Sequence, residues 1–355
     1  MITGGASGIG AAFAQRWAAR GARIIIGDVA DAAGEALVAD LRRTTGRPDH
    51  HHYLRCDVTS WDSQAHFFRE AALRLGPGLD AVVANAGIRD VGFDFCSGDP
   101  GAGDAGDDDG PSKPDLKCLD VNITGLMYTA HLAMYWLARN DRRRKGHEDA
   151  SGSGGAGRDR HLLLIGSIAG LMPFTPNPQY TASKHAVVGL FRALRGTAWR
   201  RDVRVNMLCP YFIRTAIVPP IGQMFLAGSG IGSVDAVVDA GTRLVADDSV
   251  VGRALAVGPR VRTRNPASGE DEFEIVELME GKEDEGIGGG DAGGGNEGTV
   301  VRGAWEIYAH DYEAVEVFVY RFTRMLHHVE RIRGWTGWVM DYVTAIKTAV
   351  VGPGK

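Results

Sequence analysis

Hydrophobic and polar positions follow a regular order along the first 260 residues. Short apolar runs, typical of strands, alternate with longer stretches that carry an apolar residue every three or four positions, typical of amphipathic helices. The expected strands lie at 24–26, 53–58, 81–83, 162–165, 203–208 and 253–257, and the expected helices at 11–20, 32–43, 62–75, 116–139 and 180–200. Because strand and helix alternate at this spacing, the pattern predicts a doubly wound α/β fold, with a parallel sheet covered by helices on both faces.

The pattern changes after residue 259. Residues 260–301 are acidic and rich in glycine, which is typical of a linker or a long surface insertion. Residues 302–355 carry two apolar stripes at helical spacing, from Val315 to Ile332 and from Trp335 to Ile346, and they predict a helical C-terminal extension. We expect its apolar faces to pack on residues 1–259 or on a second copy, and less readily on a membrane surface.

Composition and charge exclude several classes of protein. A formal net charge of -5 provides no concentrated positive face for nucleic acid. No apolar run approaches the ~20 residues of a membrane span, and the N-terminus lacks the pattern of a secretion signal, so we expect a cytoplasmic protein. The four cysteines form no Cys-x-x-Cys pair, and the adjacent histidines 50–52 are typical of a solvated loop, so no metal site is expected.

A glycine-rich turn occupies residues 3–10 and is followed directly by an amphipathic helix. Its glycines, Gly4, Gly8 and Gly10, allow a tight turn and close approach of a pyrophosphate to the helix N-terminus. Asp28 ends the next strand, 18 residues beyond Gly10, where a carboxylate can bond ribose hydroxyls. The same carboxylate repels a 2′-phosphate, and the turn holds no Arg or Lys, so NAD is favoured over NADP. A strand-end turn residue is the alternative interpretation of Asp28.

A second group of residues carries candidate chemistry. Tyr180 and Lys184 are four positions apart on an expected helix, so they share one face. A neighbouring ammonium favours the phenolate form, which makes Tyr180 a candidate proton acceptor. Ser167 ends an apolar strand, at the edge of the sheet where ligands bind in such folds. Singly, each residue has an ordinary structural interpretation, but their joint occurrence after a nucleotide-binding turn favours catalysis.

Taken together, these motifs resemble the short-chain dehydrogenase/reductase family, with its Rossmann-like fold. The resemblance covers residues 1–259 and rests on the turn at 3–10, Asn85-Ala-Gly87, Asn122, Ser167 and Tyr180-x-x-x-Lys184. The run 233–259 is similar to the branch of the family that includes NAD-dependent 15-hydroxyprostaglandin dehydrogenase. Residues 1–259 would therefore form the dinucleotide-binding and catalytic domain.

The resemblance implies a role for each matching residue. Tyr180 would be the general acid/base, Lys184 would support it and hold the nicotinamide ribose, Ser167 would orient the substrate oxygen, and Asn122 would support a proton relay. The implied cofactor-binding residues are Gly4, Ser7, Gly8, Ile9, Gly10, Asp28, Asp57, Val58, Asn85, Gly87, Tyr180, Lys184 and Thr215. The implied reaction is hydride transfer between NAD and a secondary alcohol or ketone. Apolar residues between 217 and 226 favour a lipophilic substrate, although core packing explains them equally well, and the family's habit implies a homo-oligomer.

Two departures from the family pattern keep an alternative open. Only Met1 and Ile2 precede Thr3, whereas a strand of ~5–6 residues should lead into the glycine turn, so the first strand is expected to be largely missing. Its loss would deprive the neighbouring strands of partners and the turn of its anchor. Tyr211 stands where the family usually has glycine. The alternative is a non-catalytic or impaired nucleotide-binding protein.

Overall fold

A computed structural model describes most of the chain. The described residues are 1–75, 78–90, 114–139, 159–172, 177–213, 215, 230–264, 274–278, 299–308, 321, 324–325, 328–329 and 332. The chain divides into two compact units, Met1–Ile307 and Tyr308–Lys355. Residues 217–226, the two apolar stripes between Val315 and Ile346, and most of the acidic segment lie largely or wholly outside the described residues. Of these stripes, the described residues between Arg321 and Ile332 are helical.

The first unit alternates strands and helices in the expected order. Its strands are β1 (Ile2–Thr3), β2 (Ile24–Asp28), β3 (His51–Arg55), β4 (Ala81–Ala84), β5 (His161–Ile165), β6 (Arg204–Pro210), β7 (Ala254–Arg264), β8 (Glu274–Leu278) and β9 (Thr299–Ile307). Its helices are α1 (Gly8–Ala19), α2 (Asp31–Thr45), α3 (Trp61–Arg74), α4 (Lys117–Leu119), α5 (Leu126–Leu137), α7 (Pro178–Arg195) and α9 (Val234–Ala246), with a π-helical segment at Asp120–Gly125. Short 3₁₀ turns lie at Pro48–His50, Ile168–Gly170 and Ala198–Arg201.

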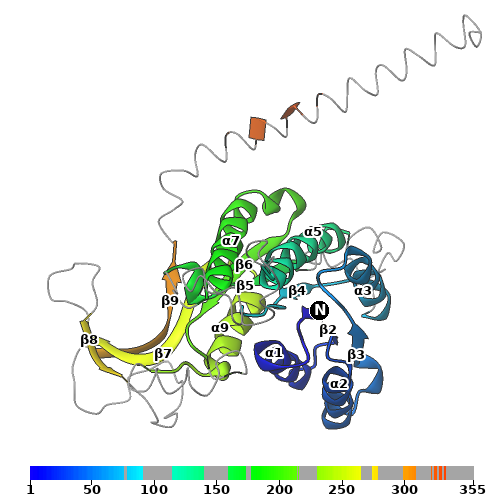
Figure 1. Ribbon diagram of the computed structural model, residues 1–355, viewed down its shortest axis with the longest axis horizontal. Coiled ribbons are helices and arrows are strands. Elements are labelled where there is room, and N and C mark those ends of the chain that lie inside the picture. Colours follow the sequence, from blue (N-terminus) through cyan, green and yellow to red (C-terminus); the bar gives the residue numbers. More distant parts are fainter. Residues whose placement is uncertain are drawn as a thin grey trace, which may run out of the picture. The chain divides into compact units, whose positions relative to one another are not determined.

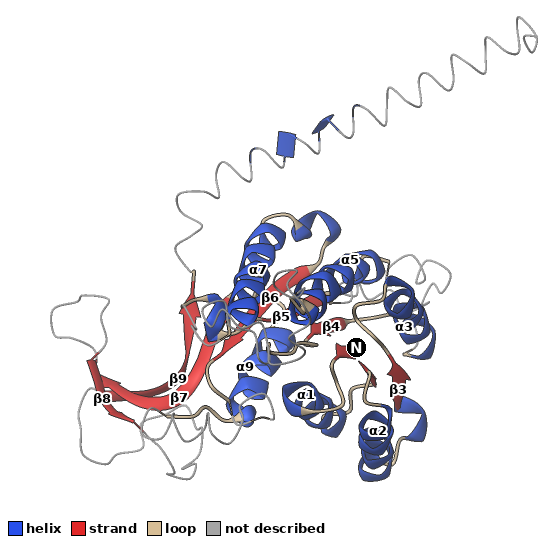
Figure 2. Ribbon diagram, in the orientation of Figure 1, coloured by secondary structure: helices blue, strands red, loops and turns tan. Residues whose placement is uncertain are grey.

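The central sheet has the strand order β3-β2-β1-β4-β5-β6-β7, and every pairing along it is parallel. Helices α1, α2 and α9 cover one face, and α3, α5 and α7 cover the other (Figure 1). Figure 2 shows the same two helical layers with the sheet between them. The fold is therefore the expected doubly wound, Rossmann-like α/β class.

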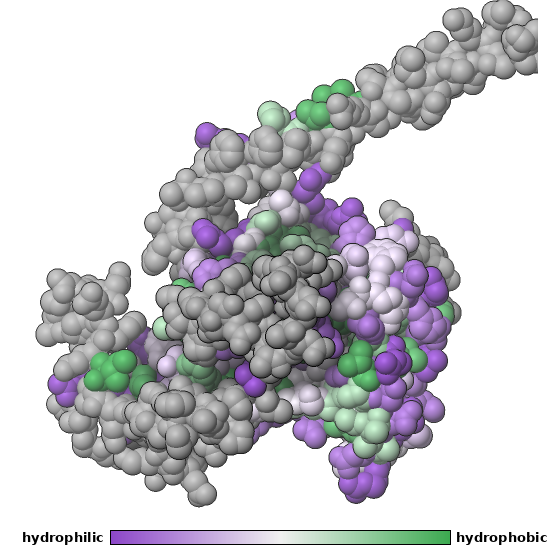
Figure 3. Space-filling view, viewed as in Figure 1, coloured by the Kyte–Doolittle hydropathy of each residue, from purple (hydrophilic) through white to green (hydrophobic). Residues whose placement is uncertain are grey.

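The inner strands β2, β4 and β5 are almost fully buried, which explains their largely apolar sequence. Ile26, Leu163 and Leu208 are fully buried beside Phe13 of α1. The covering helices are amphipathic instead. Helix α2 turns Gly34, Val38 and Leu41 inward, whereas the charged residues Glu35, Arg42 and Arg43 are exposed. Figure 3 shows hydrophilic and weakly hydrophobic residues side by side on this part of the surface.

Strand β1 is only two residues long, yet it occupies the centre of the sheet. Ile2 pairs with Ile26 of β2 on one side and with Val83 of β4 on the other. The backbone N–H of Val83 also donates to the oxygen of Met1, at 2.9 Å. The expectation that the neighbouring strands lose their partners and that the turn loses its anchor is therefore wrong, because two residues reach both neighbours.

The sheet continues beyond the expected boundary at residue 259. Strand β7 runs on to Arg264, and both β8 and β9 pair with it in antiparallel orientation. Residues 299–307, at the junction of the expected linker and the expected helical extension, form one of these strands. The acidic, glycine-rich residues that separate β8 from β9 in the sequence make these strands hard to recognise. The first compact unit ends at Ile307.

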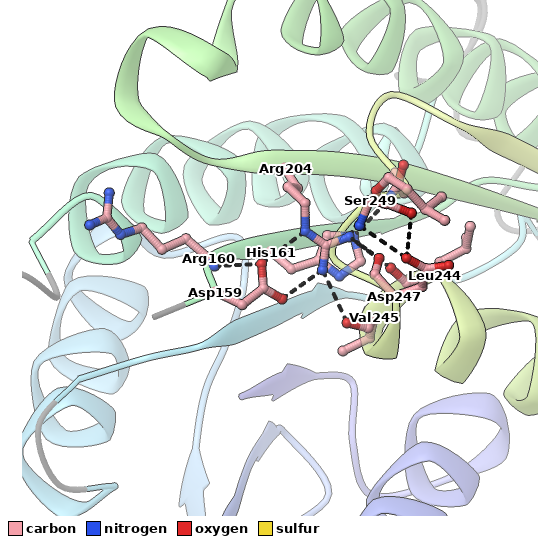
Figure 4. Close-up of polar contacts among 10 residues, drawn as sticks. Asp159, Arg160, His161, Arg204, Leu244, Val245, Asp247 and Ser249 are labelled. Atoms are coloured by element: carbon pink, nitrogen blue, oxygen red, sulfur yellow. Dashed lines mark hydrogen bonds and ion pairs between the residues drawn. The ribbon is translucent and has the colours of Figure 1, made fainter. Parts of the chain in front are cut away.

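A polar cluster closes the edge of the sheet at which β5 and β6 begin (Figure 4). Arg204 donates to the backbone oxygens of Leu244, Val245 and Asp247, at 2.8 to 3.1 Å, and so caps the C-terminus of α9. Its guanidinium also forms an ion pair of 2.6 Å with Asp159. One arginine thus joins a helix end to the sheet.

His161 is fully buried beside this cluster and accepts a hydrogen bond from the side chain of Asn206, at 2.9 Å. Burial, together with the positive charge of Arg204, lowers the pKa of His161 from 6.5 to about 3. Above pH 6.5 the ring is neutral in both the folded and the unfolded chain. Below it, the unfolded chain binds a proton that the folded chain rejects, so folding loses stability as the pH falls from 6.5 towards 3.

We expect this group to lower the free energy of unfolding by up to about 1.4 kcal/mol per pH unit below 6.5. His161→Gln keeps a side chain that can accept from Asn206 but does not titrate. Urea titrations between pH 7 and pH 4 should therefore show a shallower decline for the variant than for the unaltered chain. If the free energy of unfolding fell equally steeply with pH in the two proteins, the lowered pKa of His161 would be contradicted.

Candidate active site

The glycine-rich turn joins β1 to α1 and takes the shape that its glycines allow. Gly4 and Gly8 have φ values of +63° and +53°, a region that L side chains rarely adopt. The N–H groups of Gly4 and Gly5 donate to the oxygen of Gly27, at 2.8 and 3.3 Å. These bonds hold the turn against the end of β2.

Asn85, just beyond β4, holds the same turn from the other side. Its side-chain amide donates to the oxygens of Thr3, at 3.1 Å, and of Gly4, at 2.8 Å. The Thr3 hydroxyl accepts from the backbone N–H groups of Asn85 and Ala86, at 3.2 and 3.3 Å. The ends of β1, β2 and β4 are therefore joined around the turn, at the edge of the sheet where ligands of doubly wound folds bind.

The N-terminus of α1 fits an anionic group. Ser7 is its N-cap residue but makes no side-chain capping bond, and the first turn contains no acidic residue. By contrast, Ser60 and Ser233 cap the N-termini of α3 and α9 with their own side chains. The first N–H groups of α1, at Gly8 and Ile9, are thus available together with the positive end of the helix dipole. A β-carbon on Gly8 would lie 3.9 Å from Thr215, which places that residue over the turn.

Asp28 ends β2 as expected, and its carboxylate faces the turn. One oxygen accepts from the N–H of Ala6, at 3.0 Å, and the other from the N–H of Ala30, at 3.1 Å. The sheet also places Arg55, at the end of β3, directly opposite Asp28. Arg55 donates to the oxygen of Val29, at 2.9 Å.

The positive charge of Arg55 is paired with the carboxylate of Asp31. Asp31 forms an ion pair of 2.6 Å with Arg55 and accepts a hydrogen bond of 2.6 Å from the hydroxyl of Tyr53. The bond from Tyr53, followed by the interaction with Arg55, lowers the pKa of Asp31. No sequence pattern connects Arg55 with Asp31, because only the pairing of β2 with β3 brings these two residues together.

Asp57 and Val58 follow β3 but point in different directions. Asp57 is exposed and accepts from the N–H and the hydroxyl of Thr59, at 2.9 and 2.7 Å, which closes a turn. Val58 is buried against Gly125, where a β-carbon would lie 2.8 Å from the valine side chain. This contact ties the end of β3 to the π-helical segment.

Lys184 connects several of the expected catalytic residues. It is only 5% exposed, and its ammonium donates to the oxygen of Ile165 at the end of β5, at 3.1 Å. The ammonium lies 5.5 Å from the centre of the Tyr180 ring. A β-carbon on Gly87 would lie 3.6 Å from the same ammonium and 3.3 Å from the side-chain oxygen of Asn122. These contacts bring together the segments that follow β4 and β5 and the helix α7.

Asn122 lies in the π-helical segment and is 2% exposed. Its side chain accepts from the N–H of Ile88 and donates to the oxygen of the same residue, each at 2.8 Å. It also donates to the hydroxyl of Ser183, at 3.0 Å, which in turn donates to the oxygen of Tyr180, at 2.7 Å. Irregular π segments of this kind are common at functional sites.

Ser167 lies two residues beyond β5, close to the oxygen that Lys184 contacts. It is 7% exposed and forms the N-cap of the 3₁₀ turn Ile168–Gly170, where its hydroxyl accepts from the N–H of Ala169 at 3.1 Å. The hydroxyl proton is not used by this bond. Ser167 can therefore still donate a hydrogen bond to a bound oxygen.

The described part of the chain also bears on metal binding, the cysteines and membrane-spanning helices. No group of three or more His, Cys, Asp or Glu residues there is arranged to hold a metal ion. Cys56, Cys118 and Cys209 are buried free thiols. Among the described helices, none is long and apolar enough to cross a membrane.

Fold and site together define a Rossmann-like protein in which a glycine-rich turn, an aspartate at the end of β2 and a tyrosine–lysine pair lie along one edge of a parallel sheet. Residues 1–224 match the family model described as short chain dehydrogenase. The chain therefore belongs to the short-chain dehydrogenase/reductase family of oxidoreductases, whose dehydrogenases use nicotinamide cofactors.

Curated relatives agree with this assignment. The chain is 34% identical to the 5′-hydroxyaverantin dehydrogenase of Dothistroma septosporum (strain NZE10 / CBS 128990), over 73% of this chain and 83% of the relative. It is 30% identical to the NADP-dependent dehydrogenase M3 of Phoma sp. (strain ATCC 20986 / MF5453), over 79% of each chain. It is 28% identical to the NAD(+) 15-hydroxyprostaglandin dehydrogenase of Homo sapiens, over 67% of this chain and 77% of the relative.

A solved structure shows the same fold. Levodione reductase matches with a TM-score of 0.59 at 21% identity, over 72% of this chain and 94% of that chain.

Proposed function

We propose that this protein is an NAD-dependent oxidoreductase that transfers a hydride between nicotinamide and a secondary alcohol or ketone. The observation that carries the proposal is the position of the Lys184 ammonium. It lies 5.5 Å from the centre of the Tyr180 ring and 3.1 Å from the oxygen of Ile165. Tyr180, the end of β5 and Gly87 thus meet where the nicotinamide end of a cofactor on the glycine-rich turn would lie.

In this proposal each residue has one task. Tyr180 accepts the proton of the substrate hydroxyl, and the Lys184 ammonium lies 5.5 Å from the centre of its ring. Ser167 donates its free hydroxyl proton to the substrate oxygen. Asn122 fixes the segment at Ile88 through two bonds of 2.8 Å and supports the route by which the proton leaves. When bound, the nicotinamide cofactor supplies the hydride chemistry.

The cofactor would be held by the turn and by the residues around it. The N–H groups of Gly8 and Ile9 would bind the diphosphate, Asp28 would bond the adenosine ribose, and Asn85 would keep the turn in place. The remaining contacts proposed for the cofactor are those of Gly4, Ser7, Gly10, Asp57, Val58, Gly87, Tyr180, Lys184 and Thr215. The uncapped N-terminus of α1 supports this arrangement.

Charge at the ribose end supports NAD over NADP. Asp28 would repel a 2′-phosphate, and Arg55, which donates to Val29 in the loop after β2, already forms an ion pair of 2.6 Å with Asp31. The names of the relatives include both NADP and NAD(+). The preference for NAD is therefore inferred from the residues of this chain.

Asp28→Asn should weaken this preference. The substitution keeps the size of the side chain and removes its charge, so the ratio of the Kd for NADP to the Kd for NAD is expected to fall by about tenfold, equivalent to about 1.4 kcal/mol. Titration of the protein with each nucleotide measures both constants. Asp40→Asn, an exposed change in the middle of α2, is the matched control and should leave the ratio unaltered. An unchanged ratio in Asp28→Asn would contradict the proposal.

Activity with NAD across a panel of secondary alcohols tests the reaction itself. Oxidation of one or more of them, with formation of reduced nicotinamide, is the expected result. A chain that binds NAD and oxidises none of them would favour the non-catalytic alternative. That alternative depended on a missing first strand, and the pairing of β1 with both of its neighbours supports the enzyme instead.

The proposal extends to the substrate class and to the assembly. We propose a lipophilic alcohol or ketone on the basis of the apolar residues at 217–226. A homo-oligomer is supported by exposed apolar side chains on α5, where Met127 and Tyr135 are each 41% exposed.

A further inference from the structure

Asp90 is a buried acid at the end of the segment that follows β4. It is 7% exposed, and its carboxylate accepts two backbone N–H groups from the first turn of α7. One oxygen accepts from Gln179, at 3.1 Å, and the other from Tyr180, at 3.3 Å. A residue 90 positions away in the chain thus bonds the backbone of the tyrosine that we propose as the acid/base.

These bonds replace the cap that α7 lacks. Asn177 is the N-cap residue of α7, but its side chain caps no N–H of the helix. In the orientation that its surroundings favour, its amide donates instead to the backbone oxygen of Asp90, at 3.1 Å, and to the carboxylate, at 3.2 Å. Helix N-termini usually obtain this bond from the N-cap residue itself, so the use of a distant acid is a feature of this fold.

The same segment is fixed a second time, two residues earlier. Asn122 binds both the N–H and the oxygen of Ile88, each at 2.8 Å. Gly87, one residue before, is the residue that approaches Asn122 and Lys184. The segment Gly87–Asp90 is therefore bonded at Ile88 by the side chain of Asn122 and at Asp90 by the backbone of Tyr180.

We propose that Asp90 is a positioning residue for catalysis: by capping α7 from the segment after β4, it fixes Tyr180 relative to Gly87 and Asn122. The inference rests on the proposed role of Tyr180. The carboxylate acts on the backbone of Tyr180 and touches no reacting atom. A small displacement of an acid/base group from its productive position is costly, because proton transfer requires hydrogen-bond distance to the substrate.

Asp90→Asn tests this in the full-length protein. Asparagine has the same size, but it replaces one of the two accepting oxygens by an NH₂ group, a donor that would face one of the backbone N–H donors. We expect kcat to fall by 10-fold to 100-fold, with the Kd for NAD within twofold of the unaltered value. Hydrogen–deuterium exchange of the peptide 177–184 should become faster, and this readout does not depend on activity.

Ser60→Ala is the matched control, because it removes a side-chain N-cap from α3, where Ser60 accepts from the N–H of Ser63 at 3.3 Å. A purely structural cap would affect both variants in the same way: a lower Tm and an unchanged kcat at saturating NAD. That result for Asp90→Asn would overturn the inference.

A double-mutant cycle with Tyr180→Phe separates positioning from an independent effect. If Asp90 acts through the Tyr180 hydroxyl, Asp90→Asn should leave the residual rate of the Tyr180→Phe variant unchanged. A further loss of the same size in that background would overturn the inference while leaving the proposed function intact. Absence of turnover in the unaltered chain, by contrast, would contradict the proposed function itself, and the inference with it.

Discussion

Tyr180→Phe is expected to lower kcat by about 10²-fold to 10⁴-fold, the usual contribution of a positioned acid/base group. Phenylalanine keeps the ring and its packing beside Lys184, whose ammonium lies 5.5 Å from the ring centre, but it has no proton to exchange. The Kd for NAD should change little, because the proposed cofactor contacts of the glycine-rich turn and Asp28 are untouched. Steady-state kinetics at saturating NAD, together with NAD titration, measures the two effects separately.

Tyr128→Phe is the matched control for this change. Tyr128 lies on α5, where its ring packs edge-on against Trp61 with centroids 5.4 Å apart. Loss of its hydroxyl should leave kcat within twofold of the unaltered protein. If Tyr180→Phe retained the full rate as well, the proton would have to pass through another group, and the proposed mechanism would be wrong.

The sequence predicts the central layers of the fold because their signals are local. A strand buried on both faces is dominated by apolar residues, as at 162–165 in β5, and a covering helix is amphipathic, as in α2. The glycine-rich turn is equally local, since the positive φ values of Gly4 and Gly8 nearly require glycine. The amino-acid sequence alone is therefore sufficient to predict these elements.

The antiparallel additions could not be predicted in this way. Strand β7 continues through a polar run to Arg264, and β9 pairs with it from within a region expected as linker and tail. These strands are joined by backbone hydrogen bonds between segments far apart in the chain. Such bonds do not require a periodic pattern of apolar side chains. Composition alone therefore did not reveal that β7 runs past residue 259.

Some features of the candidate site could be predicted from local sequence, and others depend on the folded structure. The pairing of Tyr180 with Lys184 follows from helical spacing and needs no structure. The contact of Lys184 with Ile165 depends on how α7 packs on the sheet, and the bond of Asp90 to Tyr180 joins residues that share no pattern. Only the folded chain reveals such partners, because hydrogen bonds between distant segments are set by topology.

Gly10→Ala is expected to abolish tight cofactor binding. A β-carbon at Gly10 would lie 2.3 Å from the oxygen of Gly4 and 2.6 Å from the side-chain nitrogen of Asn85. The first neighbour is backbone, and the second is already bonded to that same oxygen at 2.8 Å, so neither can yield without opening the turn. Because the first N–H groups of α1 then lose their orientation, we expect the Kd for NAD to rise at least about 100-fold, or about 2.7 kcal/mol, with a lower Tm.

Gly189→Ala makes the same chemical change where space is open. Gly189 lies on the exposed side of α7, and a β-carbon there meets no atom within 4 Å. Alanine is favoured over glycine inside a helix by about 0.8–1.0 kcal/mol, so this variant should gain thermal stability and bind NAD as before. Opposite shifts in Tm for the two substitutions, with NAD binding lost in only one, would place the effect of Gly10→Ala in the turn. Retention of NAD affinity by Gly10→Ala would instead mean that the nucleotide binds without this turn, and the cofactor site would have to be sought elsewhere.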